Sequence, residues 1–175
     1  MSAIYGILRF DGEDAAPRDM ERVGEILAHR GPDGQTFVVF KHVGLGHCLM
    51  HVNQEDVFEA QPIRDDEANL LLVADLRIDN REELADACGI GEAMLREMPD
   101  SALVLHAYKK WGEDAAKHLL GDFAFAAWNA RARRLVLVRD AVGGRAAVLQ
   151  SRRSIYRLRH RLFRPIRAPG LAAHA

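Results

Sequence analysis

The apolar stretch FAFAAW at residues 123–128, followed closely by RLVLVRD at residues 134–140, constrains the fold more than any other feature. The short polar segment between them, NARAR, is typical of the turn of a β-hairpin. Residues 36–40 and 43–52 repeat this arrangement, and residues 69–76 (NLLLVADL) predict a further, buried strand. Strands that pair in hairpins favour antiparallel sheets over an alternating parallel sheet.

Helices are expected between these strands, after a first strand at residues 4–10. The first helix begins at Pro17, because proline is tolerated at the first helical position. Its predicted apolar face consists of Met20, Val23, Ile26 and Leu27. Asn80 and Glu83 predict a capping box at the start of a second helix, and Asp100 predicts the N-cap of a third. Helices grouped between hairpins predict an α+β layered sandwich.

The length and composition limit the class of protein. With 175 residues, of which 49% are hydrophobic, the chain has the size of one globular domain with a sizeable core. No run of about 18 apolar residues and no signal-peptide pattern occurs, which predicts a cytoplasmic protein with no membrane partner. Cys48 and Cys88 form no CxxC pair and are expected in the core. His47 and His51 lie near Cys48, but no second cluster completes a ligand set, so no metal site is expected.

Charge divides the chain into two unequal parts. Residues 1–145 contain all 25 acidic residues and carry a net charge of −8, whereas residues 146–175 contain seven Arg and no acidic residue. We therefore expect a folded domain over 1–145 and an Arg-rich tail over 146–175 that is disordered or the out-of-frame remnant of a truncated product. The alternative for the tail is an arm that contacts an anionic surface, with nucleic acid the less favoured partner.

Several motifs along residues 1–145 resemble those of one known family. They are LAHRGPDG at 27–34, LGH at 45–47, QP at 61–62, LHAYKKWG at 105–112 and LLGDFAFAAWNARARRLVLVRDAVGGR at 119–145. Their order and spacing resemble the N-terminal glutaminase domain of glutamine-hydrolysing asparagine synthetases. The resemblance implies a class-II glutamine amidotransferase domain with an N-terminal-nucleophile hydrolase fold, in which two antiparallel sheets lie between helical layers. In the HRGPDG segment, Asp33 is expected to hold a structural turn by hydrogen bonds.

The resemblance also implies a reaction and its groups. In the family, an N-terminal Cys attacks the glutamine amide with its own α-amino group as the base. An Arg binds the substrate carboxylate, and an Asp and a neighbouring acidic residue bind its ammonium group. An Asn side chain with a Gly N–H forms the oxyanion hole. A further domain of full-length relatives uses ATP and Mg²⁺ to adenylate a carboxylate. We expect that domain to be missing from this chain, which would then need no cofactor of its own.

At most of these positions the sequence departs from the family pattern. Ser2, followed by Ala3, stands at the nucleophile position, and Leu49 stands where the Arg is expected. Aligning DLRIDN with the family's NGEIYN places Asp75, Leu76 and Arg77 at the positions of the oxyanion Asn, the Gly and an acidic residue. Asp100 alone matches, at the position of the ammonium-binding Asp. The sequence therefore predicts a domain without glutaminase activity.

Three functions remain open from the sequence. The first is a degenerate glutaminase domain that serves a synthetase domain or subunit as a folded platform. Such domains occur in relatives that close amide rings without glutamine, such as β-lactam synthetases and lasso-peptide cyclases. The stretch VADLRIDNREEL in particular resembles the corresponding stretch of lasso-peptide cyclases. The second is an amidohydrolase that uses Ser2 on an amide other than glutamine. The third is an anion-binding module that uses the basic tail, and a homodimer is compatible with each of the three.

Overall fold

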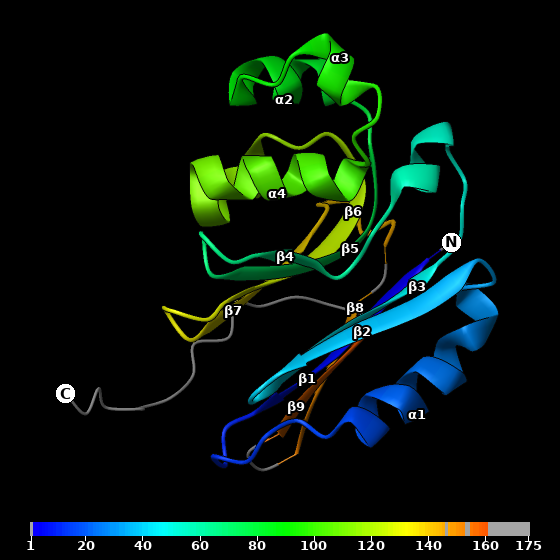
Figure 1. Cartoon of the computed structure of the whole chain (residues 1–175), viewed down its shortest axis with the longest axis vertical. Coiled ribbons are helices and arrows are strands. Elements are labelled where there is room, and N and C mark those ends of the chain that lie inside the picture. Colours follow the sequence, from blue (N-terminus) through cyan, green and yellow to red (C-terminus); the bar gives the residue numbers. More distant parts are fainter. Residues whose placement is uncertain (1, 146, 153–154, 161–175) are drawn as a thin grey trace.

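The computed structural model describes residues 2–145, 147–152 and 155–160 (Figure 1). Its strands are β1 (Ala3–Arg9), β2 (Gly34–Phe40), β3 (Val43–Leu49), β4 (Ile63–Asp65), β5 (Leu70–Ile78), β6 (Gly121–Asn129), β7 (Arg134–Arg139), β8 (Ala147–Arg152) and β9 (Ile155–His160). Its α-helices are α1 (Pro17–Leu27), α2 (Arg81–Cys88), α3 (Glu92–Leu95) and α4 (Asp100–Trp111). The 3₁₀-helices are η1 (Ala28–Arg30), η2 (Gln54–Phe58) and η3 (Gly112–Lys117). Every strand and helix predicted from residues 1–145 is present, whereas β4, α3 and the 3₁₀-helices were not predicted.

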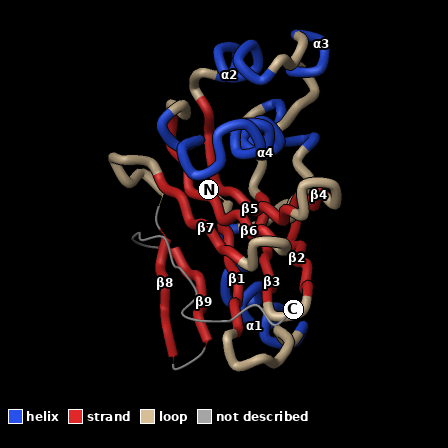
Figure 2. Tube along the Cα trace, turned by 90° about the vertical axis from the view of Figure 1, so that its left-hand side faces the viewer, coloured by secondary structure: helices blue, strands red, loops and turns tan. Residues whose placement is uncertain are grey.

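The strands form two antiparallel sheets that pack face to face. One sheet has the order β2-β3-β1-β9-β8 and the other the order β4-β5-β6-β7. Helix α1 covers the outer face of the first sheet, and α4, with α2 beyond it, covers the outer face of the second (Figures 1 and 2). The predicted α+β sandwich of two sheets between helical layers is confirmed.

The apolar core lies in three layers because each sheet is buried on both faces. The layer between the sheets contains Ile4, Leu8, Val43, Leu45, Leu71, Val73, Ala126, Trp128, Leu135 and Leu137. Tyr5 and Ile7, the alternate residues of β1, face α1 instead. The Tyr5 ring lies directly over Gly46 of the neighbouring β3, where any Cβ atom would overlap it. Burial on both faces explains why β1, β3 and β5 are continuous apolar runs.

Helix α1 follows its predicted bounds but not its whole predicted apolar face. Met20 and Gly24 are the buried residues of α1, and Val23 and Leu27 pack beside them. Ile26 is 63% exposed, so its predicted burial is wrong. Two positions along a helix correspond to about 200°, so Ile26 lies nearly opposite Gly24, which contacts the sheet.

Asn80 is the N-cap residue of α2, as predicted, but its side chain makes no capping hydrogen bond, and the predicted N-cap Asp100 is wrong. Asn80 precedes α2, but its side chain donates to the His118 carbonyl at 2.9 Å and accepts from the Leu120 N–H at 3.0 Å. Pro99 is the N-cap of α4, and Asp100 is the first residue of that helix. Short polar side chains cap a helix only when no tertiary partner competes for them, and both residues have such partners here.

The basic segment 146–175 contains two strands within its described residues. Strand β9 pairs with β1, with Gly6 opposite Leu158, and β8 pairs with β9. The expectation of a disordered tail therefore does not hold for 147–152 and 155–160. The physical reason is that β1 pairs with β3 along one edge and its other edge needs a backbone partner, whatever the side chains of that partner are. Residues 146, 153–154 and 161–175 lie outside the described residues, as does any anion-binding contact of the tail.

Candidate functional site

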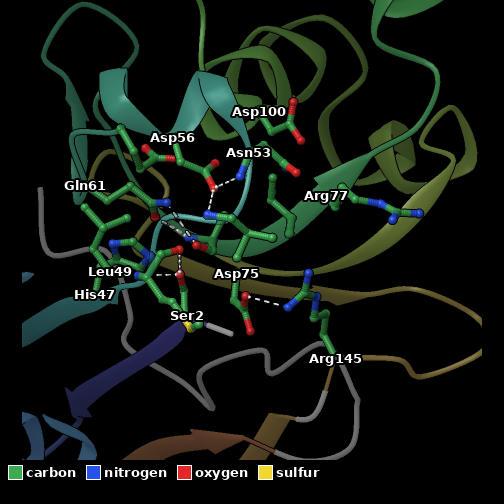
Figure 3. A pocket seen from close by; sticks show the side chains of 15 residues that line it. Ser2, His47, Leu49, Asn53, Asp56, Gln61, Asp75, Arg77, Asp100 and Arg145 are labelled. Atoms are coloured by element: carbon green, nitrogen blue, oxygen red, sulfur yellow. Dashed lines mark hydrogen bonds and ion pairs between the residues drawn. The ribbon is translucent and has the colours of Figure 1, made fainter. Parts of the chain in front are cut away.

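The residues singled out from the sequence line one pocket, although they come from different elements (Figure 3). Ser2 precedes β1, Leu49 ends β3, Asp75 and Leu76 lie in β5, and Asp100 begins α4. The pocket lies where the ends of β1, β3 and β5 meet beneath the first turn of α4. The fold thus assembles at one place the positions at which the resemblance locates catalysis and substrate binding.

The Ser2 hydroxyl is held by the backbone of the neighbouring strand end. Its Oγ accepts the Met50 N–H at 3.0 Å and donates to the Met50 carbonyl oxygen at 3.3 Å. A nucleophilic attack by Ser2 would require its hydroxyl to leave these two contacts. The side chain is nevertheless on the wall of the pocket and half-buried, the place expected of a nucleophile.

The HRGPDG segment positions Leu49, the residue that replaces the expected Arg. The Asp33 carboxylate accepts the His51 N–H at 2.8 Å, and the Asp33 N–H donates to the Leu49 carbonyl oxygen at 3.1 Å. The prediction that Asp33 holds a turn by hydrogen bonds is confirmed. These bonds anchor the end of β3 on both sides of Met50, and the side chain that this end presents at position 49 is aliphatic.

Asp75 is buried and forms an ion pair inside the pocket. It is 4% exposed, and its Oδ1 lies 3.1 Å from Arg145 Nη1. Burial raises the pKa of the Asp75 carboxyl, and the positive charge of Arg145 opposes that rise. The position of the oxyanion Asn is therefore occupied by a carboxylate that is engaged with a guanidinium group.

A fixed loop brings Arg145 to this position. After β7, the Asp140 carboxylate accepts the backbone N–H groups of Gly143, Gly144 and Arg145. This organised loop directs the Arg145 side chain toward Asp75 (Figure 3). Arg145 was not predicted as a site residue from the sequence, although it ends the last motif of the resemblance.

Asp100 is buried and bound on both carboxylate oxygens. Its Oδ2 accepts the Ile78 N–H at 2.8 Å, and its Oδ1 forms a close ion pair with Arg81. Arg81 is itself anchored by the carbonyl oxygens of Leu95, at 3.0 Å, and Met98, at 2.7 Å. Burial raises the pKa of Asp100, opposed by the Ile78 N–H and by Arg81. The one matching substrate position is thus engaged by a guanidinium group of the chain itself.

Five further polar residues line the pocket, and none of them was assigned to it from the sequence: His47, Asn53, Asp56, Glu59 and Gln61. His47 is 3% exposed, and burial lowers its pKa to about 4, so its imidazole is neutral at physiological pH. Burial raises the pKa of Glu59, which accepts the Ser101 hydroxyl at 2.5 Å. Gln61, from the QP motif, donates to the Ala74 carbonyl at 2.9 Å and fixes β5 next to Asp75.

Among the described residues there is no metal site, and the buried Cys48 is not an activated nucleophile. No group of three or more His, Cys, Asp or Glu side chains suited to a metal ion occurs among them. Cys48 is buried beneath η1, and burial raises the pKa of its thiol to about 11, so it is not a thiolate at neutral pH. None of the helices in the described part of the chain is long and apolar enough to cross a membrane.

Comparison with known proteins agrees with this fold. The model of the glutamine amidotransferase domain family matches residues 1–156. The chain belongs to this family. The matched span includes β8 and the start of β9, so it continues beyond the motifs that carry the resemblance. The resemblance to the class-II glutamine amidotransferase domain of asparagine synthetases is thereby confirmed.

Relatives of this amidotransferase domain are considerably longer than the chain. Amidase chry2 of Gibberella zeae is 30% identical over 131 residues, which are 71% of this chain and 19% of that protein. Glutamine-hydrolysing asparagine synthetase 3 of Bacillus subtilis is 29% identical over 125 residues, 71% of this chain and 20% of that protein. The chain therefore spans about a fifth of the length of these relatives.

A solved structure shows the same fold. Glutamine phosphoribosylpyrophosphate amidotransferase from B. subtilis, in a complex with ADP and GMP, superimposes with a TM-score of 0.71 at 17% sequence identity. The match covers 89% of this chain and 41% of that one. The predicted N-terminal-nucleophile hydrolase fold is confirmed.

Proposed function

We propose that this amidotransferase domain does not hydrolyse glutamine and acts as a folded platform for an amide-forming synthetase domain or subunit. The observation that carries the proposal is the pocket itself, in which ion pairs within the chain occupy the two carboxylates at substrate positions, Asp75 and Asp100. That partner would be the part that uses ATP and Mg²⁺, and it would act in the cytoplasm.

This pocket offers few groups that would stabilise the transition state for amide hydrolysis. A developing oxyanion needs hydrogen-bond donors, whereas the Asp75 carboxylate is an acceptor when ionised. Loss of one oxyanion donor typically lowers the rate by about 10²- to 10³-fold. Leu76 at the Gly position and Ser2 at the Cys position add to that loss.

Substrate binding is weakened for separate reasons. Leu49 has no charge with which to bind the α-carboxylate of glutamine. The ammonium group would have to displace Arg81 from Asp100, where Arg81 also donates to two backbone carbonyls. A guanidinium group held by three partners is not readily exchanged for one ammonium group.

The platform role rests on the fold and on the relatives. The core between and around the sheets is intact, so the domain keeps a defined surface without its chemistry. In the relatives this domain is about a fifth of a longer protein, which supports a companion domain or subunit as its partner. We propose amide formation of the kind carried out by β-lactam synthetases and lasso-peptide cyclases as the associated reaction.

The experiment is glutamine hydrolysis by the purified chain, with Met1 removal established by intact mass. Ser2→Cys alone should release no ammonia above Ser2→Ala, because the thiol lacks its clamp and oxyanion hole. A combined Ser2→Cys, Leu49→Arg, Asp75→Asn, Leu76→Gly variant should gain measurable activity if these positions are the cause. Glutamine-dependent ammonia release by the unaltered chain, abolished in Ser2→Ala, would refute the proposal.

A second candidate function is favoured by the place of Ser2 on the pocket wall. An N-terminal Ser could cleave an amide that needs neither an Arg clamp nor an Asn donor. A panel of acyl-p-nitroanilides, small and large, aliphatic and aromatic, separates the two functions. Ser2-dependent release of nitroaniline would favour the amidohydrolase, and its absence for the whole panel favours the platform.

A further inference from the structure

A second cavity lies away from the Ser2 pocket, at the other end of β5. It is lined by Val38, Phe40, Arg64, Asn69, Leu71 and Trp128, among others, and encloses about 480 Å³, including the part open to solvent. Two of its walls come from β2 and β4, each an edge strand of its sheet (Figure 1). The start of β5 and the end of β6 complete the lining. None of these residues lines the Ser2 pocket.

The floor and one wall of this cavity are apolar and aromatic. Leu71 and Trp128 lie opposite each other in the β5–β6 pairing and form the floor. Phe40 lies at the end of β2 and is 41% exposed, whereas Trp128 is 7% exposed. A large aromatic ring that is half-exposed beside a buried one offers a planar apolar molecule a surface on which to stack.

The rim provides positive charge close to the exposed ring. Lys41 Nζ and Arg64 Cζ each lie 5.9 Å from the centroid of the Phe40 ring, although they come from different elements. Arg64 pairs with Asp66 at 2.5 Å, and both side chains are largely exposed. Exposed pairs contribute only about 0–1 kcal/mol, so an incoming anion can take the place of Asp66 on Arg64 at little cost.

The second acidic residue of the rim does not oppose an anion strongly. Asp65 is engaged by Lys109 at 2.6 Å, and this pair keeps the pKa of Asp65 below its usual range. The carboxylate is therefore already neutralised by a cation from α4. Lys41 remains as a positive charge beside the Phe40 ring. Among the described residues it forms no salt bridge with an acidic side chain.

Trp128, which lines the cavity, also carries a hydrogen-bond donor. Its indole N–H is buried and has no acceptor among the described residues. A buried donor without a partner typically costs about 1–3 kcal/mol. A ligand acceptor that reached this N–H would relieve that cost.

We propose that this cavity binds a small planar aromatic anion, with its ring against Phe40 and Trp128 and its anionic group on Arg64. A cationic ring is disfavoured by Lys41 and Arg64, and an aliphatic anion lacks the stacking contact. The site is independent of glutamine chemistry, because the Ser2 pocket lies at the opposite end of the same strand.

The two tryptophans of the chain allow a direct test by NMR. With ¹⁵N-labelled protein, the indole N–H signals are assigned by Trp111→Phe and Trp128→Phe. Trp111 stacks on His118 with ring centroids 4.0 Å apart and lines no part of this cavity, so it is an internal control. On titration with 1-naphthoate, the Trp128 signal should shift and saturate while the Trp111 signal stays unchanged.

Matched variants and ligands make the test decisive. Phe40→Ala should weaken 1-naphthoate binding about tenfold, whereas Phe58→Ala, which removes an exposed ring from η2, should not change it. Cyclohexanecarboxylate and 1-naphthylmethylamine should each bind at least about tenfold more weakly than 1-naphthoate. An unmoved Trp128 signal at millimolar 1-naphthoate, or equal binding of the amine, would overturn the proposal. So would unchanged affinity in a Phe40→Ala variant whose amide spectrum shows that it is folded.

Discussion

The two halves of β5 illustrate different constraints within one strand. Residues 70–74 are all buried, alternating between the layer between the sheets and the layer beneath α4. Residues 75–77 line the Ser2 pocket. The first half therefore lies wholly in the core, whereas the second half borders a pocket. We expect a substitution to cost more stability in the first half than in the second.

The largest effect should come from the packed half. Leu72 is fully buried beneath the helical layer, so Leu72→Ala should lower the free energy of unfolding by about 2–5 kcal/mol. Leu76→Ala is the matched control in the pocket half, where the side chain is only partly buried, and should cost less than half as much. Urea denaturation at pH 7 measures both. Equal losses would erase the distinction between the two halves.

His47 tests whether a polar residue of the pocket also carries stability. Its pKa is about 4 in the folded state, because it is buried, and about 6.5 when unfolded. As the pH falls from 6.5 toward 4, only the unfolded state gains a proton, so the free energy of unfolding falls. The contribution at full effect is about 3 kcal/mol.

The free energy of unfolding is measured over this pH range for the wild type and for His47→Gln. The comparison is needed because Glu59, Asp75 and Asp100 change stability with pH in the opposite sense and are present in both proteins. Their folded-state pKa values are raised, so their contribution is lost as the pH rises. The wild type should lose more stability on acidification than the variant. Parallel pH profiles would show that His47 is solvated.

The Asp75–Arg145 pair should have an intermediate effect. Arg145→Ala removes a cation from a buried carboxylate and should cost about 1–3 kcal/mol at pH 7. The loss should be smaller at pH 5, since the unpaired Asp75 has a further raised pKa and becomes protonated. Adding Asp75→Asn should restore part of the stability. A loss that is equal at both pH values, and unaffected by Asp75→Asn, would mean that the pair is not formed.

Arg77 should have the smallest effect. It pairs with Asp79 at 2.9 Å, and both side chains are about half-exposed. Arg77→Ala should therefore change the free energy of unfolding by less than about 1 kcal/mol. Thermal unfolding at low and high salt checks this, and a large change would mean that the pocket half of β5 is also constrained by packing.

Much of the site could be predicted from the sequence, but its electrostatic state could not. Motif order located Ser2, Leu49, Asp75 and Asp100 correctly as neighbours, because the fold that the motifs indicate has one place for them. Their partners Arg145 and Arg81 carried no such signal. The Asp75–Arg145 pair joins β5 to the loop after β7, and such long-range pairing leaves no local pattern.

The same limit applies to the ends of the elements. Asn80 and Asp100 have the residue types and spacing of caps, and both are used by other parts of the structure instead. Strand β9 was not expected because its composition is that of a tail, and the free edge of β1 provided its partner.

The sequence by itself determined the strands of residues 1–145 other than β4, the main helices and the layered architecture, because apolar periodicity is a local property. Only the tertiary structure decided which charges meet, which carboxylates are buried and which edge of β1 is paired. Those outcomes depend on contacts between residues far apart in the chain, where burial strengthens a charge interaction that water would otherwise screen.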